Sequence, residues 1–363
     1  MRIGIDASRA TQSFKRGPEQ YSFYLIKALA EIDPKNQYLL YSPRSSDEEL
    51  ADLPPNFSWK IIPFPRLWTQ IRLSLKMLKE PPDVLFIPSH VVPIFHPKKT
   101  VLTIHDLGYK YVPEVYTPFA RFYENFSLKF LVKKATKIIT PTEATKQDLI
   151  KFTGIDPAKI VVIYHGFDQK LYKPSTAEKS SFSYILFLGR LEQKKNLIGL
   201  IKAFEILRQD NKIQHKLVLI GQPGYQYQKI KQAILNLPPA IQKDVLELGY
   251  LPAKEVAFWM RKADVFVFPS FFEGFGIPVL EAMASGIPIV ASNIPALAEI
   301  GSNTAFLVNP NDPKEIALGI KRVILDQKLR EDLIKKGLKW ASQFSWEKCA
   351  KETLAVLEEV GRE

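Results

Sequence analysis

Two carboxylates, Glu273 and Glu281, flank a glycine-containing turn in the segment 269–286 (PSFFEGFGIPVLEAMASG). A carboxylate accepts hydrogen bonds from hydroxyl groups, and glycines let a ligand approach the backbone closely. The pattern therefore suits a ligand that carries several hydroxyl groups, as a sugar does. The alternative is structural: Glu281 would only complement the dipole of a helix, and Glu273 would be a solvated loop charge.

The same segment is expected to begin a helix. Pro278 suits the first helical turn and Gly286 suits the end of a short helix, which places Glu281 in the first turn. The backbone N–H groups around Val279 and Leu280 are expected to be free there, and with the helix dipole they would form an anion site suited to a phosphate. A phosphate site with a carboxylate on either side describes a site for a sugar nucleotide.

A second segment, 184–196 (YILFLGRLEQKKN), carries two cations that favour phosphate binding. Arg190 follows an expected buried strand after the turn at Gly189, and Lys195 precedes a helix that Asn196 is suited to cap. Such a pair can neutralise a diphosphate and the charge that grows on it as a glycosidic bond breaks. The alternative is that both side chains are solvated cations near a strand end.

The first half of the chain offers weaker candidates. His105 and Asp106 follow an expected strand, where a histidine could hydrogen-bond a substrate hydroxyl or move a proton. A lone histidine is more often structural, and that alternative stays open. The segment from Arg16 through Gly17 to Tyr21 lies ahead of a helical pattern, and we expect it to form a loop that approaches the acceptor or the diphosphate.

Short apolar, β-branched runs alternate with helical patterns along the whole chain. We expect strands at 3–6, 38–41, 60–62, 84–87, 101–104, 137–140 and 160–164, and then at 184–188, 217–220, 245–248, 265–268, 289–291 and 305–308. Several runs are continuously apolar, as parallel strands covered on both faces require. The sequence therefore predicts an α/β protein with two doubly wound, Rossmann-like domains facing a central cleft, where ligands bind beyond the carboxyl ends of strands.

The domain limits follow from a polar stretch with little apolar periodicity. We expect a linker at 169–182, an N-terminal domain of residues 1–168 plus 345–363, and a second domain of residues 183–344. Ser345 is suited to cap a final helix whose apolar stripe, beginning at Trp346, needs a partner surface.

Composition limits the function classes. The chain has 363 residues with 46% hydrophobic residues, which is enough for a large core and excludes disorder. A single cysteine, Cys349, excludes an intrachain disulfide and favours a reducing compartment, so we expect a cytoplasmic protein without a secretory signal or membrane span. The net charge of +12 favours an anionic partner: nucleic acid, nucleotide phosphates or an anionic membrane surface.

Two basic segments also carry apolar stripes. Residues 60–79 contain five cations and no acidic residue, with Trp68, Ile71, Leu75 and Leu78 at helical spacing. Residues 119–137 interleave five aromatic residues with lysines. Basic amphipathic helices can lie in a membrane interface, although an apolar stripe is more often core. A nucleic-acid-binding protein is the rival class, but no recognised module is present, and the first βα turn lacks the glycine fingerprint of a nicotinamide-dependent oxidoreductase.

Taken together, the Gly-Arg…Lys-Asn, Glu-x7-Glu and Thr-x-His-Asp segments resemble the retaining glycosyltransferases of family 4, which share the GT-B fold. The resemblance covers nearly the whole chain and is strongest to bacterial mannosyltransferase-type members. Two segments depart from the family's usual pattern: Arg16-Gly17 stands where a pair of glycines is common, and His165-Gly-Phe-Asp168 stands where Asn-Gly-Val-Asp is usual.

The resemblance implies roles for individual residues. Glu273 would hold hydroxyls of the donor sugar, Glu281 would bind the ribose, and Arg190 and Lys195 would hold the diphosphate, with His105 near the reacting centre. The rest of the implied site comprises Gly249, Tyr250 and Leu251 at the base, Gly274, Phe275, Gly276, Ile277, Val279 and Leu280 along the donor, and Gly17, Tyr21 and Asp106 on the acceptor side.

A reaction follows from the resemblance. It implies transfer of a hexose with retention, by front-face attack in which the leaving phosphate takes the acceptor's proton, because no first-domain carboxylate stands out as a nucleophile and Asp106 is more plausibly structural. No metal or other cofactor is expected, and no Asp-x-Asp motif is present. GDP-mannose is the first choice of donor, with UDP-glucose or UDP-N-acetylglucosamine as alternatives.

The implied partners are a nucleotide sugar and a glycan or lipid-linked acceptor of cell-envelope polysaccharide assembly, such as O-antigen. Nucleic acid is not expected as a partner. Peripheral contact with the cytoplasmic face of the cell membrane is the preferred location. A sugar-nucleotide enzyme of another kind, such as an epimerase, is a further alternative, which the Glu273 and Glu281 pair with Arg190 and Lys195 argues against.

Overall fold

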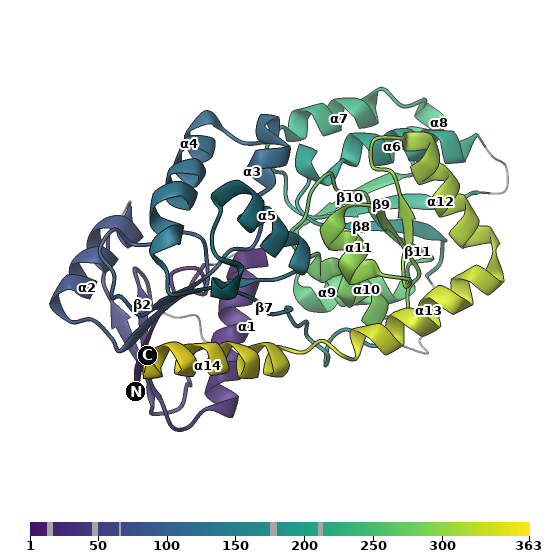
Figure 1. Ribbon diagram of the computed structural model, residues 1–363. Helices are drawn as coiled ribbons and strands as arrows, with labels where there is room; N and C mark the ends of the chain where they lie inside the picture. Colours follow the sequence, from purple (N-terminus) through teal and green to yellow (C-terminus); the bar gives the residue numbers. More distant parts are fainter. Residues whose placement is uncertain (13–16, 46–49, 65–66, 175–179, 210–212) are drawn as a thin grey trace. The chain divides into compact units, whose positions relative to one another are not determined.

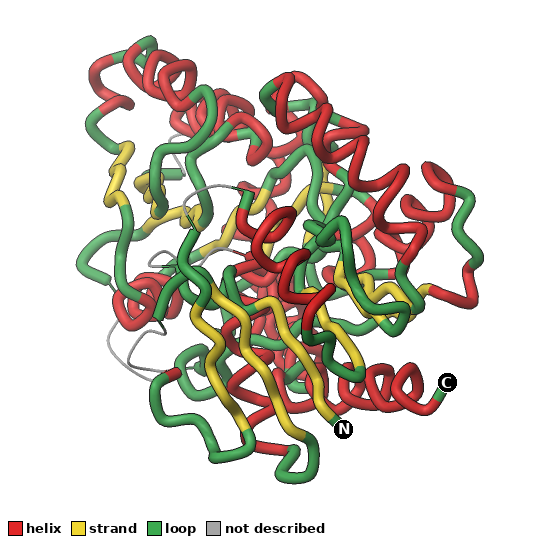
Figure 2. Tube along the Cα trace, turned by 90° about the vertical axis from the view of Figure 1, so that its left-hand side faces the viewer, coloured by secondary structure: helices red, strands yellow, loops and turns green. Residues whose placement is uncertain are grey.

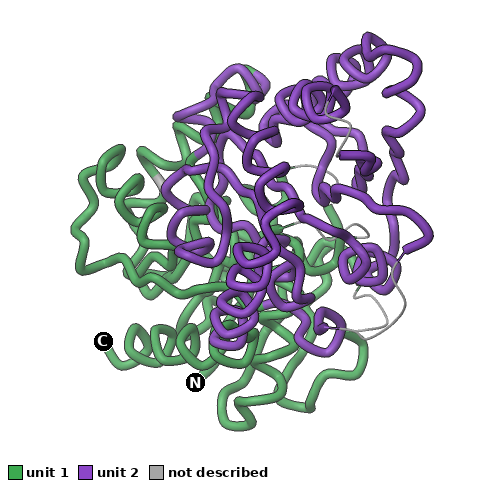
Figure 3. The backbone as a smooth tube through the Cα atoms, turned by 90° about the vertical axis from the view of Figure 1, so that its right-hand side faces the viewer, with its two compact units in different colours: residues 1–107, 118–166, 344–363 green, residues 108–117, 167–343 purple. Residues whose placement is uncertain are grey.

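The computed structural model describes residues 1–12, 17–45, 50–64, 67–174, 180–209 and 213–363 (Figure 1). The chain divides into two compact units, shown in Figure 3. Unit 1 comprises residues 1–107, 118–166 and 344–363, and unit 2 comprises residues 108–117 and 167–343. The segment 108–117, which the sequence assigned to the N-terminal domain, therefore belongs to unit 2.

Unit 1 contains a parallel seven-stranded sheet in the order β3-β2-β1-β4-β5-β6-β7 within the described residues. Figure 2 shows strands of this sheet side by side near the N-terminus. Every residue of β4 is buried, so both faces of the sheet are covered, as its continuous apolar sequence requires. The strands are β1 (Arg2–Asp6), β2 (Gln37–Ser42), β3 (Phe57–Ile61), β4 (Val84–Ile87), β5 (Thr100–Thr103), β6 (Lys137–Thr140) and β7 (Ile160–Val162).

The helices of unit 1 include the last helix of the chain, which packs across the first (Figure 1). Trp346 stacks on Tyr24 with ring planes 8° apart, and Ser345 caps the helix by accepting from the Lys348 N–H. The stripe that begins at Trp346 thus has its partner surface, as expected. The helical segments are α1 (Gly17–Ile32), η2 (Thr69–Leu73), α2 (Ser74–Lys79), α4 (Pro118–Phe126), η4 (Ser127–Leu131), η5 (Val132–Lys134), α5 (Glu143–Thr153), η6 (Pro157–Lys159) and α14 (Trp346–Arg362).

Unit 2 contains a parallel six-stranded sheet in the order β10-β9-β8-β11-β12-β13 within the described residues. The strands at its centre, β8 and β11, are apolar and almost fully buried. This sheet therefore has the same doubly wound organisation as the first. Its strands are β8 (Tyr184–Leu188), β9 (Lys216–Ile220), β10 (Val245–Gly249), β11 (Val265–Phe268), β12 (Ile289–Ser292) and β13 (Phe306–Val308).

The helices of unit 2 cover its sheet, and α6 packs against α12 while α10 packs against α13. Asn196 caps α6 by accepting from the Gly199 N–H, as predicted. The helical segments are α3 (Gly108–Tyr111), η3 (Pro113–Val115), η7 (Gln193–Lys195), α6 (Leu197–Arg208), α7 (Tyr227–Leu235), α8 (Pro239–Gln242), α9 (Ala253–Lys262), α10 (Ile277–Ala284), α11 (Pro295–Gly301), α12 (Pro313–Leu325) and α13 (Gln327–Ala341).

Three expectations about local structure need correction. The strand expected at 60–62 is β3, which begins at Phe57 and ends at Ile61; it is an edge strand with half-exposed residues, so its apolar signal is weak. The strand expected to reach residue 164 ends at Val162. The expected linker 169–182 packs on unit 2 where it is described, because Arg261 donates to the Leu171 carbonyl and Pro174 lies beside Gly286; residues 175–179 are outside the described residues.

No helix in the described part of the chain is both long and apolar enough to cross a bilayer.

Candidate active site

The candidate site in unit 2 lies where the strand order of its sheet reverses. The chain leaves β8 toward β9 on one side, whereas β11 lies on the other side of β8. In open parallel sheets, ligands bind at such an edge, where the loops of neighbouring strands diverge. Arg190 follows β8 and Glu273 follows β11, so the two predicted motifs begin at the carboxyl ends of adjacent strands.

Lys195 and Glu273 form an ion pair between these two loops. The Lys195 Nζ lies 2.5 Å from Glu273 Oε1 and 5.2 Å from the centre of the Phe268 ring. The side chains are only 16% and 10% exposed, so little water screens the pair. The structure thus brings together two of the residues that the sequence singled out, from motifs 78 residues apart.

Arg190 lies in the loop that follows β8, at the same edge of the sheet. Its Nε is 3.5 Å from Glu192 Oε2, and its side chain is 40% exposed, so it can turn toward an anion. The turn beside it depends on glycines, because a Cβ on Gly221 would overlap the carbonyl oxygen of Gly189. Gly221 also has φ +149°, a conformation that other residues rarely adopt.

Aromatic side chains that sequence analysis missed support the Glu273 loop. The Phe272 ring stacks on Tyr111 with ring centres 5.0 Å apart, and the Phe271 N–H donates to the Lys194 carbonyl. Lys194 Nζ in turn donates to the Tyr116 hydroxyl at 3.3 Å. Segment 108–117 thus braces the loop. The signal that could have drawn attention to it was the Phe271-Phe272 pair directly before Glu273.

The start of α10 differs from expectation in two ways. The Val279 N–H is not free, because it donates to the Gly276 carbonyl at 2.9 Å. Glu281 lies in the second turn, because the helix begins at Ile277 rather than at Pro278. Gly276 caps the helix with φ +96°, and the bend at Gly286 follows the helix end as predicted.

The expected donor-binding residues with large apolar side chains in the Glu273 loop and α10 are buried, so a ligand could meet only their backbone. These residues are Phe275, Ile277, Val279 and Leu280.

Glu281 is buried close to Asp168 and Tyr172, which lie where the chain enters unit 2. The Tyr172 hydroxyl hydrogen-bonds the Glu281 carboxyl, and Asp168 lies close enough to repel a charge there. Burial is the main cause that raises the pKa of Glu281 from 4.5 to about 8, and Asp168 adds to the rise while Tyr172 opposes it. Glu281 is therefore protonated at neutral pH in the absence of a ligand, so its hydroxyl can donate as well as accept a hydrogen bond.

The segment expected at the base follows the edge strand β10. Gly249 ends this strand with φ +69°, and its carbonyl accepts from the Gly221 N–H. Tyr250 is exposed and Leu251 is half-buried. The aromatic ring of Tyr250 is thus accessible beside the loop that follows β9.

His105 lies in unit 1, just beyond β5. Its Nε2 is 3.0 Å from the Pro88 carbonyl, which only accepts, so Nε2 carries the proton and Nδ1 is an acceptor. Burial lowers the pKa of His105 to about 4. The imidazole is therefore neutral at physiological pH and can accept a hydrogen bond from a hydroxyl.

The expected acceptor-side loop is only partly a loop. Gly17 begins α1, and Tyr21 is fully buried in that helix, with its hydroxyl 3.1 Å from Thr103 Oγ1. Tyr21 supports His105 by an edge-on ring contact rather than facing a ligand. Asp106 is half-buried beside His105, and Arg16 lies outside the described residues.

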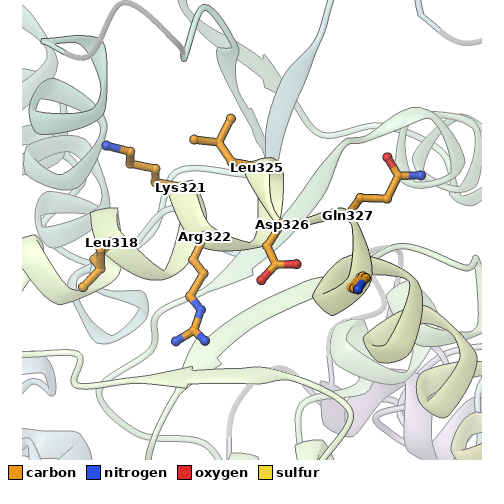
Figure 4. Close-up of a pocket in the computed structure, with 7 residues that line it drawn as sticks. Leu318, Lys321, Arg322, Leu325, Asp326 and Gln327 are labelled. Carbon is orange, nitrogen blue, oxygen red and sulfur yellow. The ribbon is translucent and has the colours of Figure 1, made fainter.

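A hollow of about 530 Å³ lies elsewhere on unit 2, at the junction of α12 and α13 (Figure 4). Lys321, Arg322 and Asp326 line it. It holds none of the predicted site residues and lies at helix ends rather than beyond strands, so it is not the candidate site.

Comparison with known proteins decides the family. The family model described as "Glycosyltransferase Family 4" matches residues 15–171, and "Glycosyl transferases group 1" matches residues 168–340. The chain belongs to glycosyltransferase family 4. The two models meet close to the boundary between the units and together span most of this glycosyltransferase.

Individual proteins are also similar to this glycosyltransferase. The O-antigen chain mannosyltransferase B of Escherichia coli is 29% identical over 71% of this chain and 69% of its own. The solved structure of a sucrose-phosphate synthase from Thermosynechococcus elongatus matches with a TM-score of 0.80 at 19% identity, over 99% of this chain and 98% of its own. HepE from Anabaena, in complex with UDP and glucose, matches with a TM-score of 0.75 at 20% identity, over 99% of this chain and 100% of its own.

The fold is therefore the GT-B fold of glycosyltransferases, as the resemblance implied.

Proposed function

We propose that this glycosyltransferase moves a hexose, with retention of configuration, from a nucleoside diphosphate sugar to a hydroxyl of a glycan or lipid-linked acceptor in cell-envelope polysaccharide assembly. The observation that carries the proposal is the shielded pair of Lys195 and Glu273 at the carboxyl edge of β8 and β11, with Arg190 in the loop that directly follows β8. A cation for phosphate and a carboxylate for sugar hydroxyls then lie side by side, as a sugar nucleotide requires.

The proposed reaction breaks the bond between the anomeric carbon and the phosphate oxygen and forms a bond from that carbon to the acceptor oxygen. The acceptor's hydroxyl proton passes to the leaving phosphate oxygen, and the products are the glycoside and a nucleoside diphosphate. Arg190 and Lys195 stabilise the negative charge that develops on the diphosphate in the transition state. Fixed cations lower the activation barrier mainly by stabilising this charge. Glu273 holds the sugar hydroxyls.

GDP-mannose is the proposed donor, because the Escherichia coli relative is named as a mannosyltransferase. UDP-glucose or UDP-N-acetylglucosamine is the alternative, supported by the likeness to HepE, whose structure contains UDP and glucose. We further propose that no metal takes part, with the two cations supplying the charge that a divalent ion would otherwise provide.

The experiment that tests this function incubates the purified protein with radiolabelled GDP-mannose, UDP-glucose or UDP-N-acetylglucosamine and a lipid extract of bacterial envelopes. Transfer of label into the lipid fraction with release of free nucleoside diphosphate is expected from one donor, equally with magnesium and with EDTA. Nuclear magnetic resonance of the product gives the anomeric configuration. An epimerase would change the sugar without releasing nucleoside diphosphate, and this outcome would overturn the proposal.

We also propose that unit 1 contacts an anionic membrane. Phe119 and Phe122 on α4 are 72% and 70% exposed, and Ile71, Leu75 and Leu78 of the neighbouring helical segment are exposed as well. We call these five residues the apolar surface. Gln70 joins its two halves, because its Nε2 donates to the Tyr123 hydroxyl at 2.6 Å.

Cations border the apolar surface on both halves. The stretch 72–79 supplies Arg72, Lys76 and Lys79, and Lys129 follows α4, whereas Arg66 lies outside the described residues. Exposed rings among cations suit insertion at the level of anionic lipid headgroups. A nucleic acid is the competing anionic partner, and an oligonucleotide that competes with anionic vesicles for the protein would favour it.

A further inference from the structure

The loop that carries Glu273 runs from the end of β11 to the start of α10, over residues 269–276. Glu273 stands near the middle of this loop, so neither the strand nor the helix fixes its carboxylate directly. The side chain is nevertheless only 10% exposed and paired with Lys195. A group held this closely needs neighbours whose own side chains are fixed by packing. The contacts of the loop with other segments therefore decide where the carboxylate stands.

The residue next to Glu273 is held by segment 108–117. Phe272 is buried, and its ring stacks on the ring of Tyr111 with centres 5.0 Å apart and planes 19° apart. Tyr111 is the last residue of α3 and is 43% exposed, so it forms the outer layer of the stack. Aromatic rings in contact prefer a few relative orientations. The stack therefore fixes the Phe272 ring, and with it the backbone on which Glu273 stands.

A second contact fastens the loop of the other member of the ion pair. Lys194 Nζ donates to the Tyr116 hydroxyl at 3.3 Å. The same ammonium lies 5.9 Å from the centre of the Tyr116 ring and 5.7 Å from the centre of the Phe272 ring, where cations are attracted to aromatic faces. The Lys194 carbonyl accepts from the Phe271 N–H at 3.0 Å, which ties the two loops together. Both loops that supply the ion pair are thus fastened to one segment.

The segment is anchored without the help of Tyr111. The chain leaves unit 1 after Leu107 and returns to it at Pro118, and the residues between them pack in unit 2. Tyr109 and Val115 are the side chains of this segment that are buried. Core packing therefore accounts for those two residues, whereas Tyr111 is half exposed and its ring meets the residue that precedes Glu273. Truncation of Tyr111 should disturb the loop rather than the fold.

We propose that Tyr111 is a positioning residue that fixes the Glu273 carboxylate for the donor sugar by holding the Phe272 ring. Tyr116 supports the same arrangement through Lys194. Both tyrosines act through other residues, so neither is a catalytic residue. The inference rests on the proposed function, because it concerns the carboxylate that would hold the sugar hydroxyls.

The first measurement is hydrogen–deuterium exchange of the full-length protein without ligand, followed in peptides that cover residues 269–276. Tyr111→Ala is expected to speed exchange there at least fivefold, whereas Tyr111→Phe, which keeps the stacked ring, should exchange like wild type. Phe258→Ala is the matched control, because Phe258 on α9 is 47% exposed and also contacts one neighbouring ring, that of Trp259. It should leave exchange in the loop unchanged. Unchanged exchange in Tyr111→Ala overturns the inference.

The second measurement separates the sugar from the nucleotide. Tyr111→Ala is expected to lower kcat about tenfold with GDP-mannose, or with UDP-glucose if that is the donor, because a displacement of about 1 Å can cost about a hundredfold in rate. Affinity for free GDP or UDP should stay within about twofold of wild type, since Tyr111 does not hold the cations assigned to the diphosphate. Tyr111→Phe should restore kcat.

A double variant tests whether Tyr111 acts through Phe272. Phe272→Leu keeps an apolar side chain but loses the stack, and it should lower kcat as far as Tyr111→Ala does. The two changes together should lower kcat no further, because residues that act as one unit are not additive. Additive losses, or equal losses of kcat and of GDP affinity, overturn the inference. Wild-type turnover in every variant overturns the inference alone, whereas a wild-type protein that turns over no nucleotide sugar overturns the proposed function and leaves the stack as a structural contact.

Discussion

The ammonium of Lys195 lies 2.5 Å from the carboxylate of Glu273, and the two residues come from loops that follow adjacent parallel strands. Each charge compensates the other in a site with little water. A bound sugar diphosphate would meet a cation and a hydroxyl acceptor whose positions are already fixed. Preorganisation of this kind costs no rearrangement at the moment of reaction.

Removal of either member of this pair is expected to abolish most of the transfer activity. Lys195→Ala and Glu273→Gln should each lower kcat by about 10²-fold to 10³-fold, the usual effect of removing one preorganised group that stabilises the transition state. Steady-state release of nucleoside diphosphate measures this directly. Near-normal activity in both purified variants would contradict the site assignment.

A double variant of the same ion pair provides a control for folding. Lys195→Ala leaves a shielded carboxylate without its partner, which should lower the free energy of unfolding by about 3 kcal/mol. The double variant Lys195→Met with Glu273→Gln removes both charges and should recover most of that loss while staying inactive. Denaturant unfolding of the two proteins separates a loss of chemistry from a loss of structure.

Glu281 should make stability depend on pH in an unusual direction. Its pKa is about 8 when folded and near 4.5 when unfolded, so between these values the folded state holds a proton that the unfolded state has lost. The contribution of Glu281 to the free energy of unfolding therefore falls as pH rises from 4.5 to 8, by up to roughly 1.4 kcal/mol per pH unit, and is flat above 8.

Glu281→Gln tests this pH dependence, because an amide resembles the protonated acid and does not titrate. The variant should match wild type near pH 4.5 and become progressively more stable than wild type up to pH 8. Melting temperatures of both proteins, measured from pH 4.5 to 8.5, give the difference. Curves that run parallel across this range would show that Glu281 ionises normally in the folded protein.

Much of the fold could be predicted from the sequence, because buried parallel strands are continuous apolar runs with helices between them. The thirteen expected strands correspond to the strands of the two sheets, and the largest boundary error is at β3, where edge exposure weakens the signal. The caps at Asn196 and Ser345 were also predictable, since capping is local chemistry.

Features that depend on tertiary contacts were not predictable. Nothing local to segment 108–117 shows that it packs on unit 2, and the raised pKa of Glu281 results from burial beneath Tyr172. The burial of Tyr21 had a signal, because Tyr21, Leu25 and Leu29 repeat every fourth residue on one face of α1. That signal indicated core rather than a ligand-facing loop.

Gly166 should not tolerate a side chain. A Cβ at this position would overlap the backbone nitrogen of Trp346, where the last helix begins beside the loop after β7. Gly166→Ala is therefore expected to lower the free energy of unfolding by roughly 1–3 kcal/mol through overpacking. Gly17→Ala is the matched control, because a Cβ there meets open space, and it should be neutral or slightly stabilising in the same thermal unfolding assay. Equal stability of the two variants would contradict the close packing of α14.

Binding to anionic vesicles should depend on the apolar surface. Phe119→Ser with Phe122→Ser removes the two most exposed rings, and we expect at least a tenfold loss of cosedimentation with vesicles that contain phosphatidylglycerol. Leu318→Ser, at an apolar site on α12 that is 62% exposed, should leave binding unchanged. Loss of binding in both proteins, or in neither, would contradict a membrane contact at this surface.

The most direct test of the central claim is whether the protein binds one nucleoside diphosphate through Arg190 and Lys195. Melting temperatures are measured with millimolar GDP, UDP, ADP or dTDP, each with and without magnesium, because a ligand of the native state raises apparent stability. The account predicts a selective rise with GDP, or with UDP if the alternative donor is used, that needs no magnesium and is lost in Arg190→Ala and Lys195→Ala. If no nucleotide raises the melting temperature while oligonucleotides do, the donor site is wrong.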